Sequence, residues 1–221
     1  MSACRPAQLA TLHHEVLCQL GRVHFATGTQ LAHWCRVQPA AISRATAWLS
    51  DLGLVHACVL PRPAIWTLSG AAAAVSPQTA FVQRSCPSWS LMAHACHRNA
   101  LEIVLEKQQG GFRFLSRTAL LKQGFNPARG EHAGIDAAGI SWLVLLDDDL
   151  MASARIARVW RRRHTPNPGH WPDATGRAWC DVMQRYVIGC TDPVRAARHR
   201  VWIAAHDMPA CVTDIPALWP T

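Results

Sequence analysis

Apolar residues recur at spacings of three and four through the first fifty residues, and this pattern predicts three consecutive helices. The first helix spans about residues 7–20 and is ended by Gly21. Thr27 or Thr29 can cap a short second helix. A tight turn leads to a third helix that begins at Pro39, because proline suits the first helical position. The sequence therefore predicts a helix-turn-helix.

The third predicted helix has a buried face and an exposed face, and two strands follow it. Gly53 stops the helix, and strand-like segments at 54–60 and 65–68 enclose a proline-rich tip that contains Arg62. This order is typical of a winged helix-turn-helix, which we assign to residues 1–75. The apolar positions of the third helix, which we expect in the core, are Ile42, Ala45, Leu49 and Leu52.

A winged helix-turn-helix places its third helix in the major groove of double-stranded DNA, while the wing and the preceding helix hold phosphates. Double-stranded DNA is therefore the expected partner, and Arg44 is the best candidate for a guanine or phosphate contact. The exposed face is otherwise rich in alanine, so we expect modest sequence specificity. Use of the same fold for protein contacts or domain packing is the alternative. The candidate DNA-binding residues of this domain are Gln38, Ser43, Arg44 and Arg62.

The second half of the chain alternates helices and strands after a linker at residues 76–90. Residues 91–221 form a second domain, so the predicted fold class is α/β (α+β), a winged helix followed by a small α/β domain. A turn at 136–139 has hairpin chemistry and joins a short strand at Ile135 to the next strand. The predicted elements are a helix at 90–108, strands at 112–115, 142–146, 186–190 and 210–215, helices at 153–164 and 177–184, and a helix capped by Thr191-Asp192-Pro193.

Aspartates gather around this predicted hairpin. Asp136 lies in its turn, and Asp147, Asp148 and Asp149 follow the apolar strand that ends at Leu146. Since the strands of a hairpin are adjacent, Asp136 and Asp147 can converge on a divalent metal ion. Mg²⁺ or Mn²⁺ held there would neutralise a scissile phosphate and activate water. A solvated acidic turn is the alternative interpretation.

The net charge of +8 and the pI near 9.4 agree with a nucleic-acid partner. Nearly all the positive charge is arginine, which favours bidentate phosphate contacts but is equally a sign of a GC-rich genome. Arg155, Arg158 and Arg162 fall on one face of the predicted helix at 153–164. That face can follow a phosphate backbone, or it is simply solvated.

The sequence contains no run of 18 apolar residues and no basic-then-apolar segment at its start, so we expect no membrane insertion and a cytoplasmic location. Nine cysteines are scattered without paired spacing, which predicts mostly small core residues. His94, Cys96 and His97 come nearest to a ligand cluster. Their spacing on one helix does not aim three ligands at one ion.

The order of these motifs resembles the replication-relaxation proteins of plasmids and mobile elements, which are related to mobilisation relaxases. The resemblance rests on the winged helix, a helix with His94 and His97, the segment 142–149, and the segment 186–192 before an arginine-rich helix. It spans most of the chain. It implies that the second domain has a restriction-endonuclease-like fold.

Carried over to this chain, the nuclease motif places Asp136 and Asp147 at its two acidic positions and Asp149 at a following acid. The motif has a lysine two positions after its second acid, where this chain has Asp149; Lys107 and Lys122 both precede the hairpin. Three hypotheses follow. The chain is a DNA-binding protein of a plasmid or mobile element, acting in replication, mobilisation or relaxation with a degenerate nuclease domain; or a metal-dependent nickase; or a winged-helix transcriptional regulator. A homodimer or other plasmid transfer proteins are the further expected partners.

Overall fold

The computed structural model describes residues 10–58, 63–74, 88–122, 131–148, 158, 183–208, 210–216 and 218–219. The chain divides into two compact units, residues 1–99 with 218–221, and residues 100–217. The helix α4 (Trp89–Gln109) contributes residues to both units, so the division falls inside this helix rather than in the linker expected at 76–90. Residues 76–87 of that linker lie outside the described part of the chain.

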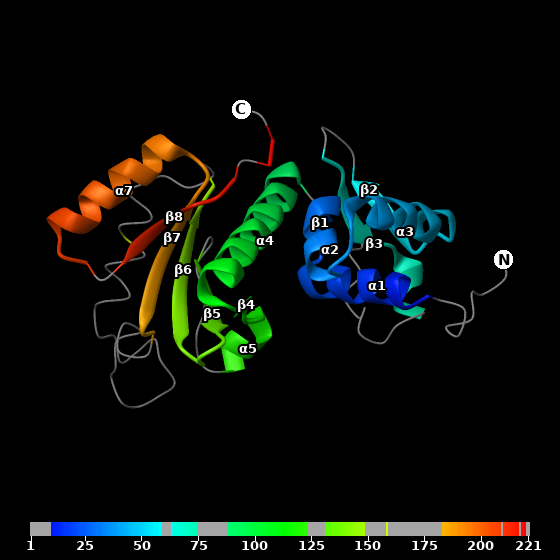
Figure 1. The fold of residues 1–221 in the computed structure, drawn as a ribbon, viewed down its shortest axis with the longest axis horizontal. Coiled ribbons are helices and arrows are strands. Elements are labelled where there is room, and N and C mark those ends of the chain that lie inside the picture. Colours follow the sequence, from blue (N-terminus) through cyan, green and yellow to red (C-terminus); the bar gives the residue numbers. More distant parts are fainter. Residues whose placement is uncertain are drawn as a thin grey trace. The chain divides into compact units, whose positions relative to one another are not determined.

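The first unit is a winged helix-turn-helix, as predicted (Figure 1). Its three strands form an antiparallel sheet in the order β1-β3-β2, and the two longer strands, β2 and β3, pair along four residues. The elements in chain order are α1 (Thr11–Val23), β1 (Ala26–Thr27), α2 (Gly28–Trp34), α3 (Pro39–Asp51), β2 (Val55–Cys58), β3 (Ile65–Leu68) and the 3₁₀ helix η2 (Gly70–Ala74).

The expected stop of α1 at Gly21 is wrong. The helix continues to Val23, because Leu20 and Val23 are both buried in the core and continued helix places them on one face. It ends at His24, which has a φ of 67° and donates its backbone N–H to the carbonyl of Leu20 at 2.8 Å.

Local signals fix the next two helices. The hydroxyl of Thr27 accepts from the backbone N–H of Gln30 at 3.3 Å, and the side chain of Gln30 accepts from the backbone N–H of Thr27 at 3.0 Å. This capping box starts α2. Helix α3 begins at Pro39, as expected, and is followed by Gly53 with a φ of 70°. Leu52 does not join the core as expected, since 39% of it is exposed beyond the last turn of α3.

The second unit is built on one five-stranded sheet in the order β4-β5-β6-β7-β8. Strands β4, β5 and β6 are antiparallel neighbours, whereas β6, β7 and β8 are parallel. The predicted hairpin is confirmed between β5 and β6, while the short helix α5 was not predicted. The elements are β4 (Phe112–Phe114), α5 (Arg117–Lys122), β5 (Glu131–Asp136), β6 (Ser141–Asp147), β7 (Arg185–Cys190), α7 (Pro193–Ala205) and β8 (Cys211–Asp214).

Both faces of this sheet are packed. Ile188 belongs to the core cluster that Trp202 of α7 covers. The next residue, Gly189, points to the opposite face and lies directly beneath Leu101 of α4. Helices therefore cover the two faces, as expected for an α/β domain. Of the helix predicted at 153–164 only Arg158 is described, and it is helical and exposed. Of the helix predicted at 177–184 only Met183 and Gln184 are described, and they are not helical, because they lead directly into β7.

Within the described residues, no helix is both long enough and apolar enough to span a bilayer.

Candidate functional site

Helix α3 presents the predicted polar face to solvent. Gln38 is its N-cap residue, and Gln38, Ser43, Arg44 and Ala47 are exposed, whereas Ile42 is buried. The Ser43 hydroxyl donates to the carbonyl of Pro39 at 3.1 Å and keeps its own oxygen available as an acceptor. Arg44 makes no ion pair with any acid in the part of the chain that the structure describes. Its guanidinium is thus available to an outside anion.

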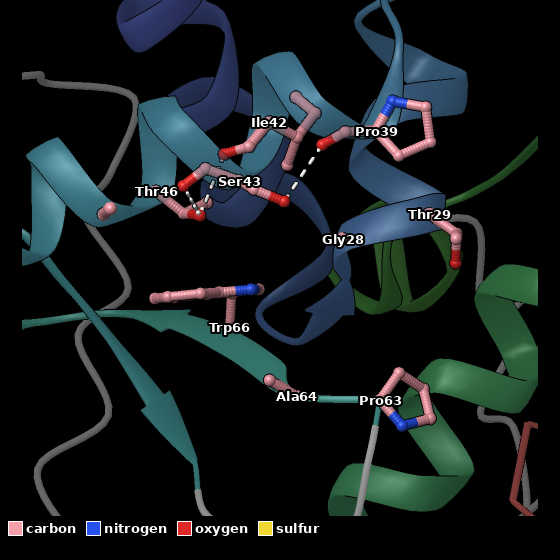
Figure 2. Close-up of a pocket in the computed structure, with 10 residues that line it drawn as sticks. Gly28, Thr29, Pro39, Ile42, Ser43, Thr46, Pro63, Ala64 and Trp66 are labelled. Atoms are coloured by element: carbon pink, nitrogen blue, oxygen red, sulfur yellow. Dashed lines mark hydrogen bonds between the residues drawn. The ribbon is translucent and has the colours of Figure 1, made fainter.

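A cleft of about 370 Å³ separates α3 from the start of β3. Figure 2 shows the indole of Trp66 lying across from Ser43 and Thr46 of α3, with Gly28 and Thr29 of α2 at one end. The cleft carries hydroxyl, small and apolar groups but no charged side chain. Its lining residues are Gly28, Thr29, Pro39, Ile42, Ser43, Thr46, Ala47, Pro63, Ala64 and Trp66.

Several predicted DNA contacts are not described. Arg62 at the wing tip lies outside the described residues, as do Arg155 and Arg162. Arg158 is exposed, but the helix that would align it with the other two is not described. The proposed basic stripe therefore stays a prediction.

Asp136 holds the β5–β6 turn together. One of its carboxylate oxygens accepts from the backbone N–H groups of Ala138 and Ile140, both at 2.9 Å. The other accepts from the indole N–H of Trp142 at 2.9 Å. The hydrogen bond from Trp142, together with the two backbone N–H donors, lowers the pKa of Asp136 below its ordinary value. Asp136 therefore has a structural role in this turn, because its side chain accepts backbone N–H groups as in an Asx turn.

The expected convergence of Asp136 and Asp147 is wrong. In the antiparallel register Ile135 lies opposite Ser141, at the turn, whereas Asp147 ends β6 at the far side of the hairpin. Six residue steps of about 3.3 Å separate the two ends of β6, roughly 20 Å. Two paired strands bring close together only the residues that lie opposite each other in the register, and Asp136 and Asp147 are not such a pair. Asp149, the following acid of the motif, lies outside the described residues.

The acid that the register brings to the Asp147 end is Glu131, which the sequence analysis missed. Glu131 is opposite Leu145, and Asp147 follows two residues later on the same face of the sheet. Only 2% of Glu131 is exposed.

Asp147 is bound by two basic side chains of α7. Arg195 donates from Nε to Oδ2 at 2.9 Å and from Nη2 to Oδ1 at 2.5 Å. His199 Nε2 lies 2.8 Å from Oδ2. The side chain of Asp147 is 0% exposed, that of Arg195 17% and that of His199 9%. Burial acts to raise the pKa of Asp147, but the hydrogen bonds from His199 and Arg195 outweigh it and the pKa is lowered.

Cys190 completes the cluster from the neighbouring strand. It lies beside Asp147 in the parallel register, with its Sγ 4.0 Å from Oδ2. Its thiol also donates to the carbonyl of Asp192 at 3.3 Å. Burial is the main cause that raises the pKa of Cys190 to about 11, so the sulfur stays a thiol at neutral pH.

A magnesium or manganese ion, as the resemblance implies, does not fit this arrangement. Such ions take oxygen ligands in open geometry. Here both oxygens of Asp147 already receive N–H donors from Arg195, and Asp136 is at the other end of the hairpin. Cys190, His199 and Asp147 do place one ligating atom each within 4.8 Å of one another. The positive charge beside the Asp147 carboxylate is nevertheless already supplied by the guanidinium of Arg195.

Arg195 and His199 were not among the predicted site residues, although the sequence carried a signal for them. They are four residues apart in a helix whose N-cap, Asp192, directly follows a buried strand. Side chains at that spacing share one helical face. The missing information was the strand register, which puts Asp147 beside Cys190 and hence beneath that face.

No known family model and no curated protein matches this chain. Solved structures do show partial similarity. The zinc-responsive MarR family member ZitR of Lactococcus lactis is 19% identical, over 36% of this chain and 57% of that chain, with a TM-score of 0.31. The oxidised form of MarR from E. coli is 21% identical, over 47% of this chain and 77% of that chain, with a TM-score of 0.31.

A MarR family transcriptional regulator from Silicibacter pomeroyi is 20% identical, over 47% of this chain and 73% of that chain, again with a TM-score of 0.31. The chain spans a little over half the length of several ZitR structures that it matches, 51% and 57% in two of them, and 73% of two others. At TM-scores this low, the winged-helix assignment rests on the topology of this chain itself.

Proposed function

We propose that this chain binds double-stranded DNA through its winged helix. The observation that supports the proposal most directly is the face of α3 on which Gln38, Ser43 and Arg44 are all exposed. Ser43 also lines the cleft beside this helix. A helix with this polar face fits a major groove, in which arginine can contact guanine or phosphate.

The cleft next to α3 suits the sugar–phosphate backbone. With α3 in the major groove and the wing over the adjacent minor groove, one strand passes between them. The hydroxyl of Ser43 offers a polar contact along this path, and Trp66 provides an apolar floor. Such contacts position the duplex without reading its sequence. Together with the alanines of α3, they support broad rather than stringent sequence preference.

The biological setting that we propose is a plasmid or mobile element, with a role in replication, mobilisation or relaxation. The support is the order of motifs along the chain, from the winged helix through the segment 142–149 to the segment 186–192. Because the buried acids do not assemble an open metal site, we propose that the chain acts by binding DNA rather than by cutting it.

Fluorescence anisotropy of the full chain with a labelled duplex of random sequence tests the binding proposal. Arg44→Ala is expected to weaken binding by about 5- to 150-fold if the side chain contacts a base, or to reduce the salt dependence by about one charge if it contacts phosphate. Arg198→Ala is the charge-matched control, since Arg198 is exposed on α7. If the two variants weaken binding equally, the loss reflects the change in net charge and not a contact of Arg44 with DNA. The absence of any duplex binding by the wild-type chain contradicts the proposal.

The genetic setting is tested separately with DNA that flanks the gene. Preferred binding to that DNA over a scrambled duplex of the same composition, and loss of plasmid copy number or transfer on deletion of the gene, are expected. Supercoiled plasmid carrying the same DNA, incubated with and without manganese, should be retarded but not nicked. Metal-dependent nicking contradicts the non-cutting role while leaving DNA binding intact.

A further inference from the structure

We infer that Arg195 takes the place of a divalent ion at Asp147, so that the second unit holds its buried acid with a guanidinium and requires no metal there. The inference concerns the second unit and is independent of DNA binding by the first. It follows from the geometry around one carboxylate and from the way in which α7 is attached to the sheet.

The guanidinium covers the edge of the carboxylate that a chelated ion would use. Its Nε and Nη2 each approach a different oxygen of Asp147, at 2.9 and 2.5 Å, in the two-point arrangement that arginine forms with carboxylates. His199 occupies a further direction at Oδ2, at 2.8 Å. An ion bound to both oxygens would have to displace Arg195 first.

The competing interpretation is a zinc site formed by Asp147, Cys190 and His199, whose ligating atoms lie within 4.8 Å of one another. These residue types are zinc ligands. The only carboxylate among the three is Asp147, however, and Arg195 already neutralises it. A doubly charged ion there would stand next to the guanidinium, and like charges at that range repel strongly. Arg195 therefore favours the metal-free arrangement.

The fold explains how the arginine arrives at this position. Asp192 accepts from the backbone N–H of Val194 at 2.7 Å and starts α7 immediately after β7. The first turn of the helix then lies above the carboxyl ends of β6 and β7, where Asp147 and Cys190 are neighbours. Arg195 lies in that first turn and His199 one turn further along the same face. The same contacts attach α7 to the sheet.

The first test uses the wild-type full chain, so it does not depend on the folding of a variant. After purification without chelator, elemental analysis should find no stoichiometric zinc, manganese or other divalent metal. Manganese or zinc added after EDTA treatment should leave the thermal unfolding midpoint unchanged. A bound stoichiometric metal, or a metal-induced rise of the midpoint that disappears in Asp147→Asn or Glu131→Gln, overturns the inference.

The second test asks whether Arg195 is the counter-ion. This test is a double-mutant cycle. Asp147→Asn should raise the unfolding equilibrium constant strongly in wild type, and by a factor at least about tenfold smaller in an Arg195→Met background. Arg195→Lys keeps the charge but loses the two-point contact. The effect of Asp147→Asn on the unfolding equilibrium constant in this background should therefore lie between its effects in wild type and in Arg195→Met. Additive effects of the two substitutions overturn the inference, because residues that act as a pair cannot be additive.

Discussion

Acidification should weaken the second unit through Asp147, and the direction of this effect follows from the hydrogen bonds around the carboxylate. The pKa of this carboxyl is lowered from 3.8 in the folded chain. Its contribution to stability is therefore complete above the unfolded-state pKa and is lost as the pH falls through the lower folded-state pKa. Breaking a buried ion pair by removing one partner costs about 3–5 kcal/mol. Because the side chain of Arg195 is 17% exposed, we expect Asp147→Asn to lower the free energy of unfolding at pH 7 by the lower end of this range, about 3 kcal/mol.

The measurement is chemical denaturation followed by circular dichroism at a series of pH values from 7 to 3, for wild type and Asp147→Asn. The variant should be less stable at pH 7, and the difference should shrink below pH 4, because wild type then loses the charge that the variant lacks throughout. Two profiles that stay parallel over this range would refute the assignment of the acid-sensitive contribution to Asp147.

A matched control exists on the same helix. Arg200 of α7 contacts Asp214 at 2.8 Å, but the two side chains are 47% and 64% exposed. Exposed ion pairs contribute about 0–1 kcal/mol. Asp214→Asn therefore makes the same chemical change against the same type of partner, and should alter stability at pH 7 by less than about 1 kcal/mol. A comparable loss in both variants contradicts the role given to burial.

Three further predictions concern packing. Thr27→Ala removes the capping-box hydroxyl of α2 and should lower the stability of the first unit by about 1 kcal/mol in denaturant titrations. Gly189→Ala forces a methyl group against Leu101 and should destabilise the second unit by about 1–3 kcal/mol, whereas Gly28→Ala, with open space around it, should not create a clash. Cys96 is fully buried with a pKa raised to about 12, so mass spectrometry should find it alkylated only under conditions that unfold the first unit.

The local signals of the first unit were readable because each one acts over a few residues. The start of α3 at Pro39 and the stop at Gly53 depend on neighbours along the chain, and the structure confirms them. Of the two threonines that could cap α2, the structure has Thr27 as the N-cap. The predicted stop at Gly21 failed because burial of Val23 outweighs the helix-weakening effect of one glycine. Core packing overrides local preference in such cases.

In the second unit the sequence by itself determined strands β4, β6, β7 and β8, the hairpin turn at Asp136 and the cap at Asp192, since hydrophobic runs and turn residues are local properties. Strand β5 was expected only at Ile135 and begins earlier, at Glu131. Only the tertiary structure decided which charged groups meet. Antiparallel pairing sends Asp136 and Asp147 to opposite ends of one hairpin, and parallel pairing puts Asp147 within reach of α7, 48 residues later at Arg195. Strand register sets these contacts, and register depends on which faces of distant segments pack together.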